Sequence, residues 1–543
     1  MHKIYFPQYA RGRDGLKLYP GESVLEHIRR MDGVEIDSEC GGQGICGRDV
    51  IRLGGGAGSL TELTETEKHF LKQGRLKQGQ RLACQARVAD DVQDIYVFIS
   101  NFGRYTILSD FIQNEVELKP SVFRRDGRVI CSNGEDLGPY EGKILGLAID
   151  IGTTTLVMQV VDLETGKNVG QPASKNPQIA YGNEVISRIG YTIDNEYGLK
   201  ELQGAVIDGI NLSLEELEKQ LGKKESINKH IYDVAAVGNS TMRNLFLGED
   251  VHNLGVIPFE AVSISAFTKK AAEIGLNIHP EAKVYAPPLI GGHAGSDCLA
   301  DIIATGLYEN TEIGMIIDIG TNGEVVVGNR DKMLTASCAA GGAYEGYQIR
   351  CGVGAIEGAI TKLKIDNGQV HYSTLGDKPP LGVCGSGVID LLAELLKNGI
   401  MNQRARIQRD FHITDNISIS QEDINQLIMA KAGLRTDQDL LIRYYGITLD
   451  EVKKIYLAGA FGNFMNVDNA MDIGLLPKIH KGKFVRYGNG ALAGARDMLV
   501  SKLKREEAEN LKSIITHFKP NEIEGKNFQY LVADNIYFDR FRQ

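Results

Sequence analysis

The pentapeptide Ile-Asp-Ile-Gly-Thr occurs twice in the chain, at residues 149–153 and again at 317–321. At both places one apolar run precedes it and another follows, which predicts two strands joined by a tight glycine turn. Such a turn exposes backbone N–H groups to a phosphate, and its aspartate can hold a hydrated Mg²⁺. A single Asp-X-Gly-Thr is also an ordinary hairpin turn. Two copies a domain apart predict duplicated halves, with Asp150 and Asp318 facing a central cleft.

The composition is that of an ordinary globular protein. The chain has 543 residues, of which 43% are hydrophobic and 24% charged, so it can hold two to four domains. Its net charge of −10 and the lack of a basic stripe argue against nucleic acid as the main partner. We expect a cytoplasmic protein without a membrane partner, because neither an apolar signal region nor a membrane-spanning run is evident. Eight cysteines in that compartment are more typical of thiols or metal ligands than of disulfides.

Residues 1–97 are predicted to form a small separate domain. Apolar periodicity and capping residues define its elements. In order, these are a hairpin of residues 3–6 and 15–19, a helix capped by Ser23, a helix from Thr64 with Glu67 completing a capping box, and strands at 81–88 and 95–99.

A glycine-rich loop in this domain contains Cys40 and Cys46, and Cys84 follows much later. Glycines let the backbone wrap an iron–sulfur cluster and direct N–H groups at its sulfides. Structural zinc is the alternative, although zinc sites rarely have this glycine density. The spacing resembles that of 2Fe–2S ferredoxins with the pattern Cys-x5-Cys-x2-Cys…Cys, except that Asp49 occupies the third cysteine position. The resemblance implies an α+β, ferredoxin-like (β-grasp) domain whose cluster is held by Cys40, Cys46, Asp49 and Cys84. The alternative for Asp49 is a solvated loop residue.

Residues 98–143 carry many turn signals and are expected to be a linker with little core of its own. A large domain is expected to follow, with its first half at 144–290 and its second half at 291–543. Cys298, Cys338, Cys351 and Cys384 lack ligand spacing and are expected to be packing residues.

Other polar and glycine-rich turns follow predicted strands in the large domain. Gly238 and Asn239 end a buried strand and precede a helix start, where a phosphate is favoured. Gly459 and Gly462 end another strand, and backbone without side chains there lets an aromatic base or a ribose lie flat. His293, in a glycine loop, is expected to be structural. Glu324 could orient a water molecule, but a surface role is the expectation.

The two Asp-X-Gly-Thr turns and the late Leu-Ala-Gly-Ala-Phe-Gly of residues 457–462 resemble the superfamily of acetate and sugar kinases, heat-shock chaperones and actin. The resemblance implies an α/β ATPase in which two ribonuclease-H-like halves close over ATP and Mg²⁺. It also assigns residues to three loops by their positions. These are Asp150, Gly152, Thr153 and Thr154 in a first phosphate loop, Asp318, Gly320, Thr321 and Asn322 in a second, and Gly459 and Gly462 in an adenosine loop.

A ferredoxin ahead of this module, together with residues 238–242 and 385–387, resembles the reductive activators of corrinoid enzymes. This resemblance implies an ATP-dependent reductase that passes one electron from a 2Fe–2S cluster to Co(II) of a corrinoid protein. The product would be Co(I) for methyl transfer, for example in a methyltransferase or O-demethylase system. An external low-potential electron donor and a homodimer are implied as well. The alternatives are an ATP-gated redox sensor and a metabolite kinase, although a kinase has no use for an iron–sulfur domain.

Overall fold

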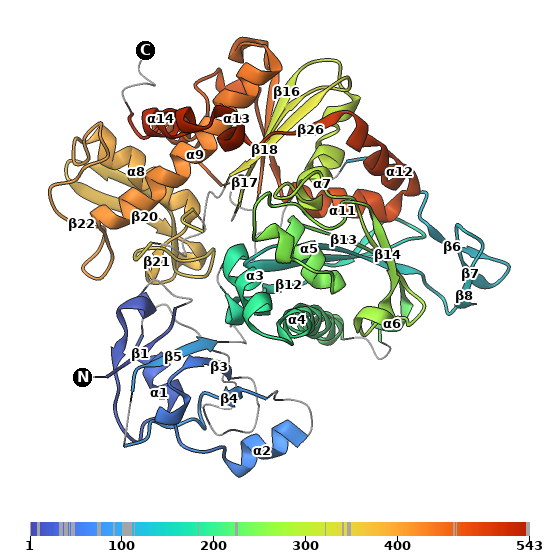
Figure 1. Ribbon diagram of the computed structural model, residues 1–543, viewed down its shortest axis with the longest axis horizontal. Coiled ribbons are helices and arrows are strands. Elements are labelled where there is room, and N and C mark those ends of the chain that lie inside the picture. The colour runs from blue at the N-terminus through green and yellow to red at the C-terminus, as the bar shows by residue number, and fades with distance from the viewer. Residues whose placement is uncertain are drawn as a thin grey trace.

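The N-terminal domain is built on a five-stranded sheet (Figure 1). The computed structural model describes all residues except 1, 8–10, 32–35, 37–41, 43, 45–48, 73–75, 77, 91–92, 100–110, 113, 183, 223–225, 321, 339–341, 345–348, 460–461, 463 and 539–543. The strand order is β2, β1, β5, β3, β4, with β1 and β5 parallel and the other neighbours antiparallel. The elements are β1 (Lys3–Tyr5), β2 (Leu16–Lys17), α1 (Val24–Arg29), β3 (Val50–Gly55), α2 (Glu65–Lys72), β4 (Gln80–Leu82) and β5 (Ile95–Ile99).

Most of the predicted elements of this domain are confirmed. Ser23 caps α1, and the Glu67 carboxylate accepts the Thr64 N–H at 2.9 Å in the expected capping box. The predicted strand at 81–88 is wrong beyond Leu82. The chain turns there because the N–H groups of Gln85 and Ala86 both donate to the Leu82 carbonyl.

Part of the expected linker is folded. Strands β6 (Val122–Arg125), β7 (Arg128–Cys131) and β8 (Asp136–Pro139) form an antiparallel sheet, and Val122, Val129, Cys131 and Leu137 are buried in a core shared with the first half. The expected lack of a core is therefore wrong for residues 122–139. The turn signals in this stretch mark its hairpins, and Figure 1 shows the small sheet on the opposite side of the first half from the N-terminal domain.

The two larger sheets repeat one local pattern. In the first half, β9 (Leu145–Ile151) pairs antiparallel with β10 (Thr155–Asp162) and parallel with β13 (Ile231–Gly238). In the second, β16 (Gly314–Ile319) pairs antiparallel with β17 (Gly323–Gly328) and parallel with β24 (Lys454–Ala458). The strands predicted around both repeated pentapeptides are confirmed, and both turns lie at equivalent strand ends.

Further strands complete these sheets and two smaller ones. The first half adds β11 (Asn168–Gly170), β12 (Ala173–Lys175), β14 (Phe267–Lys270) and β15 (Lys283–Ala286); the second adds β18 (Met333–Cys338), β25 (Phe484–Gly488) and β26 (Ile515–His517); and the smaller sheets contain β19 (Ala359–Asp366), β20 (Gln369–Thr374), β21 (Gly382–Val383), β22 (Phe411–His412) and β23 (Ser418–Ile419).

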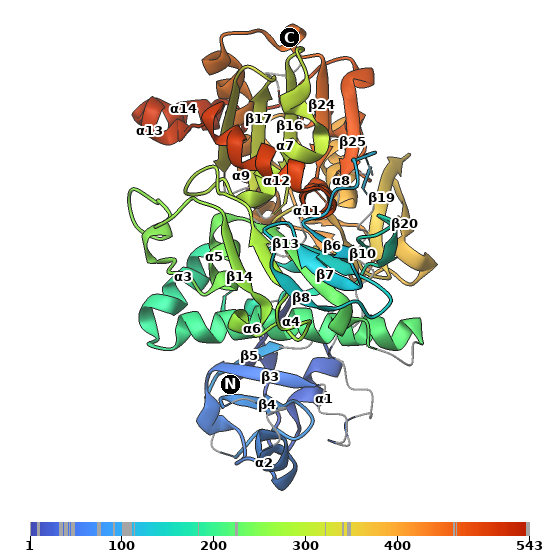
Figure 2. The same cartoon turned by 90° about the vertical axis from the view of Figure 1, so that its right-hand side faces the viewer.

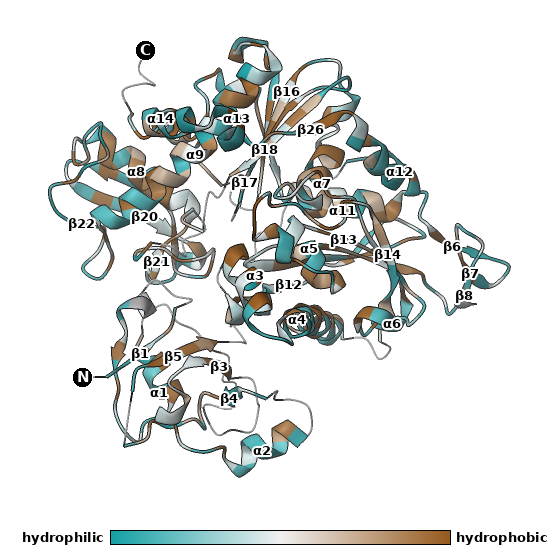
Figure 3. Cartoon of the chain, viewed as in Figure 1, coloured by the Kyte–Doolittle hydropathy of each residue, from teal (hydrophilic) through white to brown (hydrophobic). Residues whose placement is uncertain are grey.

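Helices α7 (Ser296–Thr305) and α11 (Gly490–Val500) lie between the two sheets (Figure 2). Their apolar residues join side chains from both sheets in one core, so each sheet is held against the same helix pair. Figure 3 shows apolar residues concentrated on the central strands and polar residues along α12. The other helices are α3 (Val185–Asp194), α4 (Gly198–Leu221), α5 (Ser240–Leu247), α6 (Ala271–Ile274), α8 (Gly385–Lys397), α9 (Gln421–Tyr445), α10 (Val467–Asp472), α12 (Lys502–Asn510), α13 (Pro520–Glu524) and α14 (Lys526–Asp534). Among the described residues, no helix has both the length and the apolar character required to cross a membrane.

Candidate functional site

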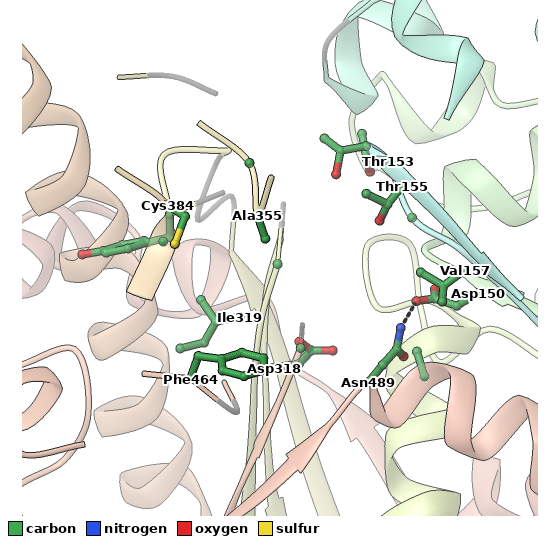
Figure 4. Close-up of a pocket in the computed structure, with 18 of the residues that line it drawn as sticks. Asp150, Thr153, Thr155, Val157, Asp318, Ile319, Ala355, Cys384, Phe464 and Asn489 are labelled. Carbon is green, nitrogen blue, oxygen red and sulfur yellow. Dashed lines mark hydrogen bonds between the residues drawn. The ribbon is translucent and has the colours of Figure 1, made fainter. Parts of the chain in front are cut away.

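A cavity of about 340 Å³ lies between the two halves, where β9 and β16 end (Figure 4). Most of the residues predicted from the two turns and the late glycine loop contribute to its wall. These residues are Asp150, Gly152, Thr153, Thr154, Asn239, Asp318, Gly320, Asn322 and Gly459. The structure therefore brings together side chains that are far apart in the sequence.

Two of the described residues that were predicted for the site, Gly238 and Gly462, do not line this cavity. Gly238 lies behind it, in register with Ile151, and a Cβ there would be 2.7 Å from the Ile151 carbonyl oxygen. Gly462 closes the late turn by donating its N–H to the Gly459 carbonyl. Gly238 and Gly462 thus shape the backbone around the cavity, while Thr321 lies outside the described residues.

The first turn is held from two sides. Asn239 caps α5 and its side-chain amide donates to the Thr153 hydroxyl at 3.0 Å. The side-chain amide of Asn176 donates to the Gly152 carbonyl at 2.8 Å. These contacts fix the turn with its backbone toward the cavity, which suits a loop that binds phosphate oxygens.

The second turn, which begins at Asp318, packs against Gly459 of the neighbouring strand end, where a side chain would not fit. Asp318 pairs in register with Ala458 on the neighbouring strand, and the chain then turns at Gly459 with a φ of 88°. A Cβ at Gly459 would be 2.5 Å from Asp318 Oδ1. Both the positive φ and the close approach to the carboxylate therefore favour glycine.

Further acidic residues lie beside the two predicted aspartates. Asp297, at the start of α7, lines the cavity and accepts the Cys298 N–H at 2.8 Å. Burial, together with the negative charges of Asp150 and Asp318, raises the pKa of Asp297 to about 7. Burial also raises the pKa of Asp318, and burial beside Asp318 raises the pKa of Asp301 well above its ordinary range.

Glu324 belongs to the same acidic group. It is 6% exposed, lines the cavity and stands directly opposite Asp318 in the β16–β17 pair. Burial, with the charges of Asp297 and Asp318 nearby, raises its pKa well above the usual value. The expected surface role of Glu324 is therefore wrong.

This concentration of carboxylates fits a bound divalent cation, which would offset their mutual repulsion. No group of three or more His, Cys, Asp or Glu side chains within the described part of the chain is placed to hold a metal directly. Mg²⁺ usually takes only one or two carboxylates and completes its shell with water and phosphate oxygens. Asp150 and Asp318 are suitably placed for that arrangement.

The opposite wall of the cavity has a different chemistry. Ile319, Tyr344 and Phe464 contribute apolar surface, which suits an aromatic base. Cys384 also lines this wall, so it is not only a packing residue as expected. His293 is not among the residues that line the cavity, and its ring lies 5.5 Å from that of Phe259, in agreement with a structural role.

In the N-terminal domain, Asp49 is fully buried and contacts Cys84. The Cys84 N–H donates to Asp49 Oδ2 at 2.7 Å, and the Ala83 N–H donates to the Asp49 carbonyl at 2.8 Å. Asp49 Oδ1 is also buried and accepts no hydrogen bond among the described residues. The alternative of a solvated loop residue is therefore wrong, and a buried carboxylate oxygen beside Cys84 fits an iron ligand.

Gly42 is also close to Cys84. A Cβ placed on Gly42 would be 3.7 Å from the Cys84 Cβ, so Gly42, which lies between Cys40 and Cys46 in the sequence, is next to Cys84. Cys40 and Cys46 themselves lie outside the described residues. The described half of the predicted ligand set, Asp49 and Cys84, is thus brought together at a buried position.

Comparisons with known proteins agree with this arrangement. The family model of the RACo middle region matches residues 145–310, and that of the C-terminal domain of RACo, the ASKHA domain, matches residues 312–539. The corrinoid activation enzyme RamQ of Eubacterium limosum is 36% identical over 430 residues, which cover 73% of this chain and 72% of that protein. A reductase of Methanosarcina barkeri, specific for the Co(II) methylated amine-specific corrinoid protein, is 26% identical over 404 residues, covering 68% of this chain and 73% of that one.

A solved structure extends the similarity to nearly the whole chain. It is described as a reductive activator for corrinoid, iron-sulfur protein, and it superposes with a TM-score of 0.71 at 29% sequence identity. The similarity covers 99% of this chain and 98% of that one. The chain therefore belongs to the RACo family of corrinoid activation enzymes.

Proposed function

We propose that this protein uses ATP to drive one electron from a 2Fe–2S cluster in its N-terminal domain onto Co(II) of a corrinoid protein, regenerating Co(I). The observation that carries the proposal is the presence, in one chain of this family, of two separate sites. One is the acid-lined cavity between the repeated turns, and the other is the buried Asp49–Cys84 pair.

The N-terminal domain has features that support a ferredoxin role. Its sheet order, in which β1 and β5 are parallel and the other neighbours are antiparallel, supports a ferredoxin-like (β-grasp) fold. When bound, a 2Fe–2S cluster supplies one-electron transfer at a potential near −400 mV in plant-type ferredoxins. We propose that Cys40, Cys46, Asp49 and Cys84 hold it.

ATP is required for an energetic reason. Co(I) is a stronger reductant than such a cluster, and each 100 mV uphill costs about 2.3 kcal/mol for one electron. We propose that Gly152, Thr153 and Thr154 contact one side of the polyphosphate, and Gly320 and Asn322 the other. Asp150 and Asp318 would orient hydrated Mg²⁺. The nucleotide need not touch the electron, because it can favour a conformation that binds the Co(II) protein better than the Co(I) protein.

The partners follow from the same reaction. A corrinoid protein accepts the electron and an external low-potential donor restores the cluster, so both are proposed partners. We also propose a homodimer formed through the large domain. A purely regulatory redox sensor would have the same two sites but would transfer no electron to cobalt.

A visible spectrum tests the proposal. A Co(II) corrinoid protein is mixed with this protein, a low-potential reductant and Mg²⁺·ATP, and the appearance of the Co(I) spectrum is followed. We expect Co(I) only when all components are present. The matched control replaces the wild-type protein with Asp318→Ala. Absence of Co(I) with a fully iron-loaded, ATP-hydrolysing protein would favour the redox sensor.

A further inference from the structure

Arg52 attaches the N-terminal domain to the first half of the large domain. It extends from β3, and its guanidinium carbon lies 4.4 Å from the ring centre of Tyr181 and 4.8 Å from that of Tyr191. Its two terminal nitrogens donate to the Ala180 carbonyl at 3.0 Å and to the Tyr191 hydroxyl at 2.8 Å. Figure 1 shows the domain against the side of the first half that carries α3. We call this set of Ala180, Tyr181 and Tyr191 the Arg52 pocket.

A weaker contact joins the N-terminal domain to the second half of the large domain. Asp14 Oδ1 lies 3.7 Å from Arg350 Nη2, and both side chains are more than half exposed. Exposed ion pairs of this kind contribute little to stability. Of these two contacts between described residues, the Arg52 pocket is therefore the stronger, because it combines two aromatic faces with two directed hydrogen bonds.

The elements that form the Arg52 pocket also hold the first phosphate loop. Ala180 and Tyr181 lie in the 3₁₀ helix Pro177–Tyr181, and the Asn176 that caps this helix donates to the Gly152 carbonyl. The Asn176 N–H donates to the Thr154 carbonyl at 2.8 Å. The first connection between the phosphate loop and Arg52 therefore runs through this 3₁₀ helix alone.

Arg188 provides the second route. It lies one turn before Tyr191 on α3, is fully buried, and donates to the Thr153 carbonyl. Its other hydrogen-bond partners are neutral, namely the Gly182 carbonyl, Gln178 Oε1 and the Met242 sulfur. A buried cation without a carboxylate among these partners is stabilised when an anionic phosphate binds beside the same loop.

We propose that the Arg52 pocket is a nucleotide-sensitive docking site, in which phosphate binding at residues 152–154 strengthens attachment of the N-terminal domain. Phosphate contacts would order the loop together with Asn176 and Arg188, and hence the helices that form the pocket. Linkage requires the converse, namely that docking of Arg52 strengthens nucleotide binding by the same factor. This inference rests on the nucleotide site proposed above.

Two measurements on the full, iron-loaded chain test it. The first is the Kd of a non-hydrolysable ATP analogue with Mg²⁺, by calorimetry. Arg52→Ala is expected to weaken binding roughly fivefold or more, within the usual range of allosteric coupling. Tyr191→Phe, which removes one hydrogen-bond partner of Arg52 but keeps the ring, is expected to have a smaller effect in the same direction. The second is hydrogen exchange of residues 49–55, which the analogue should slow in the wild type but not in Arg52→Ala.

Arg124→Ala is the matched control. Arg124 lies 4.3 Å from the ring centre of Tyr140, so it makes the same kind of contact away from the domain interface. Arg124→Ala should leave the Kd of the ATP analogue and the hydrogen exchange of residues 49–55 unchanged. An unchanged Kd in Arg52→Ala, or no effect of the analogue on exchange in the wild type, would overturn the docking proposal alone. A wild-type protein that binds no nucleotide would overturn the proposed function as well.

Discussion

The side-chain amide of Asn489 donates a hydrogen bond of 2.8 Å to Asp150 Oδ2 and so joins the start of α11 to the first repeated turn. Asn489 is itself fixed, because its Oδ1 accepts the Leu492 N–H at 2.7 Å as the cap of α11. The orientation of Asp150 is therefore set by a helix that packs against both sheets. This places one of the two proposed Mg²⁺-orienting carboxylates on a rigid support.

Replacing either aspartate should stop ATP turnover without affecting the N-terminal domain. We expect Asp150→Ala and Asp318→Ala each to lower the ATP hydrolysis rate by roughly 10²-fold or more, as for loss of other preorganised charges at reacting phosphates. Asn489→Ala should lower the ATP hydrolysis rate less, because the Asp150 carboxylate is still present. The visible spectrum of the cluster should stay the same in all three. Asp331→Ala, an exposed acid of the second half, is the control, and full ATPase activity in Asp318→Ala would refute the two-turn arrangement.

Gly459 can be tested against a matched glycine. Gly459→Ala should abolish nucleotide binding, because its Cβ would meet Asp318 Oδ1 at 2.5 Å. Gly446 has a similar φ of 84° but no atom within 4 Å of the Cβ position. Gly446→Ala should therefore show only the backbone cost of about 1 kcal/mol in stability. Calorimetric titration with Mg²⁺·ATP measures both, and equal affinities in the two variants would contradict the close contact.

The sequence predicted the strands around Asp150 and Asp318 because apolar runs flank a tight turn at both places. The same hairpin register places Glu324 opposite Asp318, a signal that the residue spacing already contained. Asp297 and Asp301 could not be located in this way. They share a face of α7 as a pair four residues apart, but only the packing of that helix between the sheets brings Asp297 to the cavity and Asp301 beside Asp318.

The β6–β8 sheet shows a different limit. Its turns were visible in the sequence, whereas the burial of Val122, Val129 and Leu137 depends on a core supplied by the first half. Asp49 illustrates a third case. Its position in the cysteine pattern indicated a ligand, but its contact with the Cys84 N–H needs β3 and β4 to be paired.

A buried carboxylate in α9 should make stability depend on pH. Asp437 is 1% exposed, and burial raises its pKa from 3.8 to about 7. Because the folded-state pKa is raised, the stability that it contributes is complete below about pH 4 and is lost as the pH rises through 7, at about 1.4 kcal/mol per pKa unit. Asp437→Asn should therefore melt at a higher temperature than the wild type at pH 8, and the difference should shrink as the pH falls toward 4. Thermal unfolding without nucleotide measures this difference.

Asp450→Asn, which replaces an exposed acid, is the control and should show no such pH-dependent gain in melting temperature. An equal gain in both variants would exclude Asp437 as the cause.

Asp49 offers a direct test of carboxylate ligation, because asparagine separates its two roles. Asp49→Asn keeps an oxygen that can accept the Cys84 N–H but lacks the negative charge that an iron ligand supplies. If Asp49 binds iron, Asp49→Asn should lose iron or change the EPR spectrum and midpoint potential. Asp49→Cys should give an all-thiolate cluster with altered visible and EPR spectra, because an oxygen ligand is harder than a thiolate and favours ferric iron.

Asp49→Ala removes both roles and should make the cluster labile, which iron analysis of the purified protein would show. Asp90→Ala, an exposed acid of the same domain, controls for general effects of lost charge. The decisive comparison is between Asp49→Asn and Asp49→Ala. If iron content, spectrum and potential stayed normal in Asp49→Asn but not in Asp49→Ala, the carboxylate would serve only to accept the Cys84 N–H, and another ligand would complete the iron site.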